Sequence, residues 1–338
     1  VYWISDRIRE LFRKYKPLMK YANVVQGLAT ADNDRFLRFW WEVEQEDISL
    51  DYKTDRKKWV PYAKGGPYNK WYGNLWWAIN WEDSGKELKD FSRSVIRNES
   101  YYFREGLTYT VVSSKGLSIR YMPKNCIFDH AGNCFFEKTE DHAALLAIIL
   151  ATSFVSMCKT ISGSVSFEVG ELKKVPIPDP SALRSKAISP DEIRDLLGSF
   201  SPHSPLSTLD SITLSSLAQD CIEIKKELYS FHVMERDFKH DPLSWGLKGL
   251  SEEGGLVNVK SALKRFFLHK AELEARLLIN EAVNDELVLK LYELLPEGTT
   301  LREVIPLSRL LNGGRTQEPS SNLYAAVLEV LESEGIPV

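Results

Sequence analysis

The sequence predicts an α+β fold, in which a mixed or antiparallel-sheet domain over 1–180 precedes a mostly α-helical domain over 181–338. From about 21 to 140, short aromatic and β-branched runs alternate with Gly, Asn and Asp, which is typical of strands and turns. Beyond 181, longer segments carry apolar residues at helical spacing. The run Pro176–Pro180 (PIPDP) suits neither a helix nor a central strand, so we place the domain boundary there.

The elements of the first domain follow from local patterns. A short amphipathic helix is expected within 5–20, ending before Pro17. A basic and apolar edge is expected over 173–177. Strands are predicted over 107–113, 117–122 and 126–129, with Ser114-Lys115-Gly116 as the turn between the first two.

One apolar segment, 141–160, is expected to form a single buried helix. Its uncharged core, 143–158, is shorter than the roughly 18–20 residues that span a bilayer, so we expect no membrane association. In the second domain, helices are predicted over 190–200, 212–231, 257–295 (one or two helices ending near Pro296) and 320–333, with a Ser/Pro-rich loop over 201–211.

Composition indicates a soluble globular protein, with 338 residues, 43% hydrophobic and 27% charged. Four scattered cysteines do not suggest a disulfide framework, so we expect a reducing, cytoplasmic location. The net charge of −4 is uneven: 1–180 carry 26 Lys and Arg against 23 Asp and Glu, so a polyanion would prefer this half. Because the chain begins at Val1, we also expect it to be part of a longer protein.

Several enzyme classes are excluded by missing motifs. The chain contains no consecutive prolines and hence no Asn-Pro-Pro-Tyr tetrapeptide, no Gly-x-Gly, no Walker A loop and no His-Glu-x-x-His. We therefore predict no catalytic, cofactor-binding or metal-binding residues in this chain.

Three turn-rich segments are candidates for a contact surface. The first, QGLATADNDRF (26–36), would present Asn33, Asp34 and Arg35 to a hydrogen-bonding partner, since Asn pairs with adenine edges and Arg with guanine edges or phosphate. A capped loop that merely leads into a strand is an equally good interpretation of this segment.

The second segment, 53–81, interleaves basic and aromatic residues, which suits a nucleic-acid surface. Its contact candidates are Lys64, Tyr68 and Lys70, although most of its rings should lie in the core. The third is the hairpin that follows 98–108, with candidates Ser114, Lys115 and Arg120; an ordinary antiparallel pair explains this hairpin as well.

Two further patterns are weak. Cys126 and Cys134 bracket His130, but structural zinc sites place thiolates two to four residues apart and add a second pair, so we prefer two half-buried cysteines. Glu171-x-Lys173 matches the end of a nuclease motif, with no suitable aspartate upstream.

Several long segments occur in a recognisable order. They are QGLATADNDRFLRFWWEV (26–43), KWVPYAKGGPYNKWYGNLWWAINWE (58–82), NESYYFREGLTYTVVSSKGLSIRYMPKNCIFDHAGNCFF (98–136), SVSFEVGELKKVPIP (164–178), Ser230-Phe231 and DFKHDPL (237–243). With these segments the chain resembles the C-terminal half of PglX adenine-specific DNA methyltransferases of BREX phage-defence systems and of type IIG restriction-methylation enzymes. The resemblance covers about 1–180 well and 220–245 less closely, with Ala31 where the family usually has Gly.

The resemblance implies a target recognition domain with a helical spacer, which binds double-stranded DNA beside an N-terminal methyltransferase half. It implies S-adenosylmethionine as the cofactor of the parent enzyme, whereas this chain alone is expected to bind none and to be inactive. Two alternatives remain: a protein-interaction module whose acidic helical half docks onto other phage-defence proteins, and a nuclease centred on Glu171 and Lys173.

Overall fold

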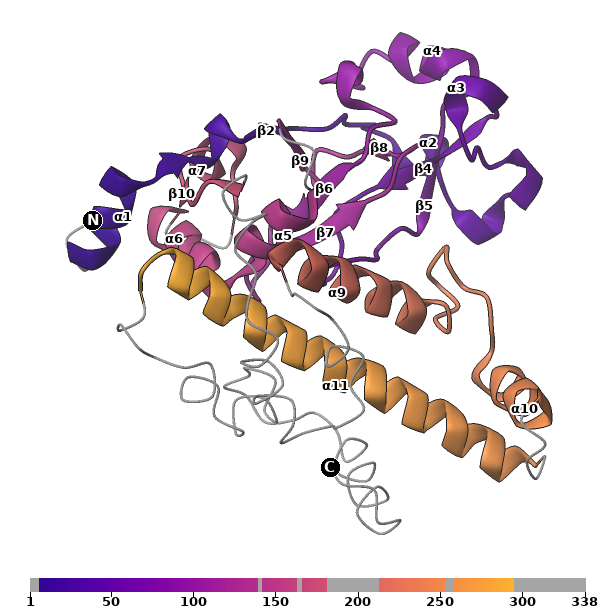
Figure 1. The fold of residues 1–338 in the computed structure, drawn as a ribbon. Coiled ribbons are helices and arrows are strands. Elements are labelled where there is room, and N and C mark those ends of the chain that lie inside the picture. The colour runs from indigo at the N-terminus through magenta and orange to yellow at the C-terminus, as the bar shows by residue number, and fades with distance from the viewer. Residues whose placement is uncertain (1–5, 139–141, 163–165, 181–212, 253–257, 295–338) are drawn as a thin grey trace. The chain divides into compact units, whose positions relative to one another are not determined.

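The computed structural model describes residues 6–138, 142–162, 166–180, 213–252 and 258–294 (Figure 1). The chain divides into two compact units, the first formed by Val1–Ser181 with His232–Phe238 and the second by Ala182–Phe231 with Lys239–Val338. Helices occur together with antiparallel and mixed sheets, which confirms the predicted α+β class.

The first unit contains two four-stranded sheets and one two-stranded sheet. Their strand orders are β2-β9-β6-β7, β3-β5-β4-β8 and β1-β10. The strands are β1 (Lys16–Pro17), β2 (Ala22–Val25), β3 (Leu37–Phe39), β4 (Trp59–Ala63), β5 (Trp77–Asn80), β6 (Gly106–Thr110), β7 (Ser118–Met122), β8 (Ile127–Phe128), β9 (Cys134–Glu137) and β10 (Pro176–Ile177).

The hairpin predicted from the sequence is present. β6 and β7 pair antiparallel with Thr108 opposite Arg120, and β6 also pairs antiparallel with β9. β8 instead pairs parallel with β4, which makes the second sheet mixed. The strands predicted over 107–113, 117–122 and 126–129 correspond to β6, β7 and β8.

The helices of the first unit are mostly short. They are α1 (Asp6–Lys14), α2 (Asn33–Phe36), α3 (Tyr52–Asp55), α4 (Glu82–Asp90), α5 (His142–Leu150), α6 (Thr152–Ser162) and α7 (Val169–Leu172), with 3-10 turns at Leu18–Lys20, Trp40–Glu42, Gln45–Asp47 and Glu99–Tyr101. α1 ends before Pro17 as predicted.

The segment predicted as one helix over 141–160 forms two, because the chain bends by 63° between α5 and α6. Seven residues of α5, from Ala144 to Leu150, are buried, and the helix lies against β6 and β7 (Figure 1). No single helix in the described ranges is long and apolar enough to cross a membrane; this bent pair meets the criterion only when both helices are counted together.

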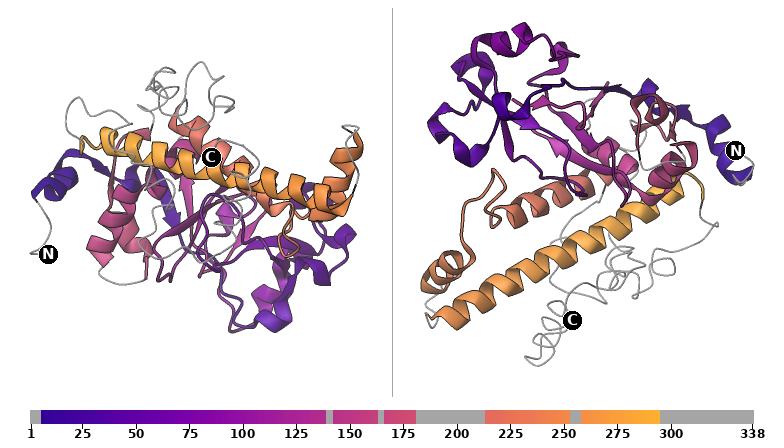
Figure 2. Two further views of the ribbon diagram at one scale, coloured as in Figure 1. Left: turned by 90° about the horizontal axis from the view of Figure 1, so that it is seen from below. Right: turned by 180° about the vertical axis from the view of Figure 1, so that it is seen from behind.

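The second unit consists, in its described part, of α9 (Leu214–Tyr229), α10 (Pro242–Glu252) and α11 (Val259–Leu291). α9 and α10 both pack along α11 (Figure 2). α10 can approach α11 closely because residue 246 is a glycine. A side chain at this position would lie 2.2 Å from the Ala262 carbonyl oxygen. The segment predicted as one or two helices over 257–295 is one helix, and the predictions for 190–200, 201–211 and 320–333 lie outside the described residues.

Candidate nucleic-acid interface

The first candidate loop is fixed at its start by a close backbone approach. A side chain at Gly27 would lie 2.1 Å from the carbonyl oxygen of Phe128, so only glycine fits where the loop passes β8. Leu28 N donates to the same carbonyl at 3.1 Å. The loop is thereby attached to the edge of the second sheet.

Further along, this loop becomes the short helix α2. Asp32 caps the helix by accepting from the Arg35 backbone N–H at 3.1 Å, and Thr30 donates to the Asn33 side-chain oxygen at 2.7 Å. Ala31 adopts a left-handed conformation with φ of 56°. Asn33 and Asp34 are exposed, as a contact role requires.

Arg35 is engaged within the fold. Its guanidinium lies 2.7 Å from a Glu87 carboxylate oxygen, and its Nε donates to the same oxygen at 2.9 Å. The guanidinium also lies over the rings of Phe36 and Phe91, at 5.1 and 5.2 Å from their centroids. Contact with a base would therefore require Arg35 to leave Glu87.

The second loop joins β4 to β5 and places Gly66, Pro67 and Tyr68 at the surface, with Tyr68 39% exposed. Asn69 N donates to Ser118 Oγ at 2.9 Å and thereby ties the loop to the hairpin. Of the eight aromatic residues in 53–81, four are buried: Tyr62, Trp71, Tyr72 and Trp81. Half of these rings therefore belong to the core, fewer than the majority expected from the sequence.

The two lysines of this loop, Lys64 and Lys70, are half-buried. Lys64 Nζ lies 5.2 Å from the centroid of the Trp77 ring. Burial lowers the pKa of the Lys64 ammonium, and the nearby Asp129 carboxylate opposes this shift. A partly desolvated ammonium that lies over an aromatic ring would favour contact with an additional negative charge.

The three candidate residues on the hairpin differ in their exposure. Ser114 and Lys115 are exposed at the turn. Arg120 is only 1% exposed, and its Nη1 donates to Ser118 Oγ at 2.8 Å and Thr110 Oγ1 at 3.2 Å. Arg120 lies opposite Thr108 in the interior of the β6–β7 pair, so in this structure its side chain is not accessible at the surface.

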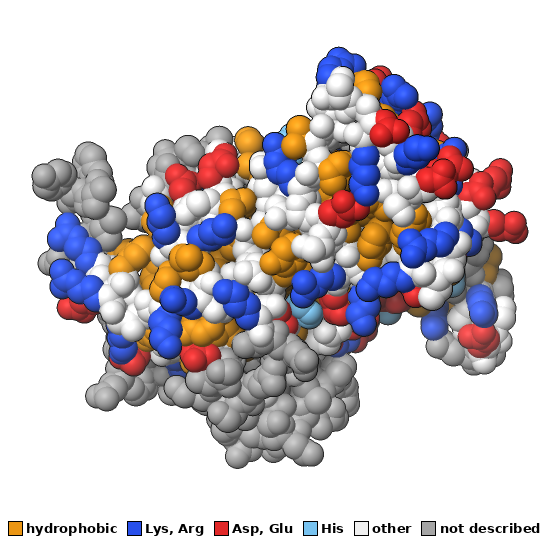
Figure 3. Space-filling view, turned by 90° about the horizontal axis from the view of Figure 1, so that it is seen from above, with side chains coloured by type: hydrophobic (Ala, Val, Ile, Leu, Met, Phe, Trp, Pro, Cys, Tyr) orange, Lys and Arg blue, Asp and Glu red, His pale blue; other side chains and the backbone are white. Residues whose placement is uncertain are grey.

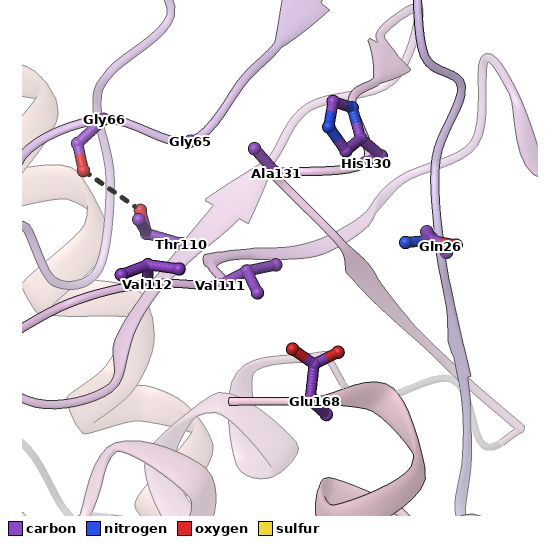
Figure 4. A pocket seen from close by; sticks show the side chains of 9 residues that line it. All are labelled: Gln26, Gly65, Gly66, Thr110, Val111, Val112, His130, Ala131 and Glu168. Atoms are coloured by element: carbon purple, nitrogen blue, oxygen red, sulfur yellow. Dashed lines mark hydrogen bonds between the residues drawn. The ribbon is translucent and has the colours of Figure 1, made fainter. Parts of the chain in front are cut away.

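The three segments meet at an open pocket of about 460 Å³ (Figure 4). Gln26 belongs to the first segment, Gly65 and Gly66 to the second, and Thr110 and its two successors to the third. The lining residues are Gln26, Gly65, Gly66, Thr110, Val111, Val112, His130, Ala131 and Glu168. Segments that are far apart in sequence therefore share one surface depression.

On one side of this pocket, the lining residues His130 and Ala131 contact the buried carboxylate of Asp129. Asp129 is 1% exposed; its carboxylate accepts from Tyr62 Oη at 2.6 Å and from Ala131 N at 2.6 Å. His130 Nδ1 lies 3.1 Å from the same carboxylate, while its side chain is 52% exposed. Burial, followed by the charge of Asp129, raises the pKa of Tyr62 well above its usual value, so the phenol stays protonated and donates to Asp129.

Sequence reasoning missed a second buried carboxylate, Glu235, which is 2% exposed. It accepts from Trp76 Nε1 at 2.8 Å, Asn74 N at 3.1 Å and Leu75 N at 3.4 Å. The neighbouring Asp237 accepts from Tyr72 Oη, and Trp40 Nε1 donates to the Met234 carbonyl at 3.0 Å. Residues 232–238 therefore belong to the packing of the first unit; the DFKHDPL motif, which begins at Asp237, was the sequence signal that could have revealed this.

The weaker sequence candidates do not form a cluster. Cys126 and Cys134 are fully buried free thiols, not the half-buried ones expected, and burial raises the pKa of both. Glu171 lies in the four-residue helix α7 and is half-buried. In the described parts of the chain, no group of three or more His, Cys, Asp or Glu side chains could hold a metal ion.

Charge on the visible surface is mixed. Seen from above, Lys and Arg side chains are spread over much of the face with hydrophobic side chains between them, and Asp and Glu also contribute (Figure 3). Because both signs of charge are interspersed, such a surface does not produce one strong electrostatic field. Binding of a charged ligand would depend on contacts with individual side chains.

Comparison with known proteins confirms the resemblance seen in the sequence. Over 192 residues the chain is 33% identical to the adenine-specific methyltransferase PglX of Lacticaseibacillus casei (strain Zhang), covering 52% of this chain and 16% of that protein. It is 36% identical over 180 residues to the adenine-specific methyltransferase BrxX of Escherichia coli O9:H4 (strain HS), covering 52% and 15%. No family model matches the chain.

These similarities support a methyltransferase-related role. The chain spans about a sixth of the length of the two curated relatives. Only the part of the relatives that aligns with this chain is therefore relevant to its structure.

Proposed function

We propose that this chain is the sequence-specific DNA recognition module of a site-specific N6-adenine DNA methyltransferase that acts in phage defence or restriction-modification in the cytoplasm. The observation that supports this most is the pocket at which Gln26, Gly65-Gly66 and Thr110–Val112 converge. Loops held on a rigid scaffold are where recognition residues are generally found. The similarity to adenine-specific methyltransferases supplies the chemical context.

In this proposal, methyl transfer and recognition are divided between parts of one enzyme. A methyltransferase half extrudes the target adenine, and this chain contacts neighbouring base pairs and phosphates. S-adenosylmethionine is the methyl donor of the complete enzyme. The residues present here do not fit that cofactor, since the sequence has neither a Gly-x-Gly loop nor an Asn-Pro-Pro-Tyr tetrapeptide, so we derive no catalytic step from this chain.

The proposed contact surface keeps most of the sequence candidates. Exposed polar groups of the first loop and the hairpin would contact the duplex, and the second loop would contribute cations and a ring. Arg35 would join them only after leaving Glu87. The residues retained are Asn33, Asp34, Lys64, Tyr68, Lys70, Ser114 and Lys115.

The test is salt-dependent duplex binding by the full 338-residue chain. Lys64→Gln and Lys115→Gln should each weaken binding to any duplex sequence and reduce the salt slope by about one, because each removes one phosphate contact. Lys248→Gln is the matched control: this lysine is 78% exposed on α10, outside the proposed surface. If the wild-type chain binds no duplex at low salt, the proposal is wrong.

A protein-interaction module is the second candidate, and one observation favours it. Between Trp40 and Asp51 the surface carries the acids Glu42, Glu44, Glu46, Asp47 and Asp51 and no base. Trp41 and Leu50 in the same segment are 44% and 86% exposed. Such a segment suits a basic partner with an apolar anchor. If the chain is a protein-interaction module of this kind, Trp41→Ala should abolish binding of the basic partner. Any salt-dependent binding of the chain to duplex DNA should be the same with and without this substitution.

A further inference from the structure

Four polar side chains that line the pocket are absent from the candidate set. Thr110 donates to the Gly66 carbonyl and His130 faces Asp129, which leaves Gln26 and Glu168 for closer consideration. Gln26 enters from the loop before α2, and Glu168 from the segment before α7; in Figure 4 both point towards the open space between them. Neither lies on a hairpin turn or in a basic run, so the sequence pattern did not single them out.

Gln26 has a fixed backbone and an available side chain. Its carbonyl oxygen accepts from Asn98 Nδ2 at 2.8 Å, and the adjacent Gly27 is held against β8. In the described part of the chain, no hydrogen bond engages the side-chain amide of Gln26. The amide can therefore offer both its donor and its acceptor to a ligand.

Glu168 is held by its neighbours along the chain. Phe167 N donates to the Val111 carbonyl at 2.8 Å, which attaches this segment to the end of β6. One carboxylate oxygen of Glu168 accepts from Ser166 Oγ at 2.7 Å. An ionised carboxylate only accepts hydrogen bonds, so this side of the pocket favours a donor and disfavours a facing acceptor.

The rest of the lining is largely apolar. Val111 and Val112 extend from the end of β6 and Ala131 from the turn after β8, and Val112 is 63% exposed. A solvent-exposed valine and an unengaged amide that line the same pocket suit a mixed polar and methyl surface. Among base pairs viewed from the major groove, A·T presents such a surface: an acceptor and a donor on adenine and a methyl group on thymine.

Building on the proposed function, we infer that this pocket reads one A·T base pair from the major groove. The Gln26 amide pairs with adenine, its NH₂ donating to N7 and its oxygen accepting from N6. Val112 contacts the thymine methyl group. Glu168 rejects guanine at the adenine position, because guanine O6 is an acceptor that would face the carboxylate.

The first experiment selects preferred sites from a random duplex library with the full chain. The wild-type chain should show a position at which A·T is preferred by roughly 5- to 150-fold, and Gln26→Ala should lose the preference at that position alone. Glu168→Gln should admit G·C there. Gln45→Ala is the matched control, since Gln45 is exposed in a 3-10 turn outside the pocket.

A second measurement changes the DNA instead of the protein, so it does not depend on the folding of a variant. Replacing the adenine with 7-deazaadenine removes N7 and should weaken wild-type binding but leave Gln26→Ala binding unchanged. Replacing the thymine with uracil removes only the methyl group and should weaken wild-type binding but not Val112→Ala binding.

The outcomes separate this inference from the proposed function. Absence of duplex binding by the wild-type chain overturns both. Duplex binding whose base preference survives Gln26→Ala, or 7-deazaadenine that weakens wild type and Gln26→Ala equally, overturns the inference and leaves the proposed function intact. Selective loss of the A·T preference in Gln26→Ala, with Gln45→Ala unchanged, supports it.

Discussion

Two regions of the first unit place polar side chains in opposite environments. In the interior, Arg120, Asp129 and Glu235 are each at most 2% exposed and are hydrogen-bonded to several groups. At the surface around the pocket, Ser114 and Lys115 are exposed. The interior set links strands, turns and loops to one another, whereas the surface set is accessible to a ligand. Charge alone therefore does not identify a contact residue: Arg120 carries the charge expected of one, but it is buried.

This contrast separates stability from binding. Removing an interior polar group leaves its partners unsatisfied in a poorly solvated site, which costs far more than the loss of one exposed hydrogen bond. Removing an exposed group on the contact surface should change binding and leave the free energy of unfolding nearly unchanged. Trp fluorescence reports mainly on the first unit, because eight of the nine tryptophans lie at or before Trp81.

The largest effect is expected at Glu235. Glu235→Ala leaves the Trp76 Nε1 and Asn74 N donors without their acceptor, and should lower the free energy of unfolding by about 3 kcal/mol. Urea denaturation followed by Trp fluorescence measures this change.

Two comparisons make the Glu235 test specific. Glu235→Gln keeps one acceptor oxygen and should cost less than Glu235→Ala. Glu46→Ala, at an exposed position in the first unit, should cost less than about 0.5 kcal/mol. A cost for Glu235→Ala as small as that of Glu46→Ala would contradict the interior role.

Asp55 is intermediate in exposure between the interior and the surface residues, and its contribution to the free energy of unfolding depends on pH. Partial burial opposes its charge, but hydrogen bonds from Ser49 and from the backbone N–H groups of Asp51, Lys57 and Leu50 outweigh this and lower the pKa of the carboxyl. Asp55→Asn should therefore lower the free energy of unfolding by about 1–2 kcal/mol near neutral pH.

The sign of the pH dependence follows from the lowered pKa. The charge of Asp55 contributes stability above the unfolded-state value of about 4, and this contribution is lost as the pH falls through the lower folded-state value. The difference between wild type and Asp55→Asn should shrink over that acidic range in urea titrations. A constant difference from pH 7 to pH 3 would show that the effect does not come from ionisation.

Some elements of both units were predictable because local patterns determine them, whereas β2, β3, β4, β5 and β9 were not predicted individually. The hairpin has two runs rich in β-branched and aromatic residues on either side of a turn that contains glycine. Gly116 in this turn adopts a φ of 114°, which disfavours other residues. α1 and α11 follow from helical spacing and a following proline. The bend between α5 and α6 was not predictable, since an uninterrupted apolar segment carries no helical phase to reveal a break.

The candidate site was harder to predict because exposure is a tertiary property. Arg35 and Arg120 resemble Lys115 in sequence terms, as cationic residues at or near turns, but only the structure shows the Glu87 pair and the buried hairpin. Gln26 was overlooked because it precedes the turn residues of its segment and lies outside the basic runs. Glu235 was overlooked because its partners are about 160 residues away in the chain.

A smaller effect is expected at Ala31, in the surface loop. Its φ of 56° falls in the left-handed region, which costs an L-residue other than glycine roughly 1 kcal/mol. Ala31→Gly should therefore stabilise the loop, by at most about 1 kcal/mol, because the greater freedom of glycine in the unfolded state offsets part of the gain.

The control for Ala31→Gly is Ala22→Gly, at a buried residue in β2, where glycine should destabilise. Both variants are compared by urea denaturation followed by Trp fluorescence. Destabilisation by Ala31→Gly would show that strain at this turn is not significant.

The smallest effect is expected for the pair Arg35 and Glu87, which decides to which region Arg35 belongs. Their side chains are 47% and 50% exposed, so solvent screens the ion pair, and a double-mutant cycle with Arg35→Ala and Glu87→Ala should give a coupling of at most about 0.5 kcal/mol. So weak a pair could exchange Glu87 for a phosphate or a guanine edge at little cost, which would return Arg35 to the contact surface. A coupling above about 1 kcal/mol would instead place Arg35 with the interior residues that hold the loops, and Arg35→Ala should then change the free energy of unfolding more than it changes duplex binding.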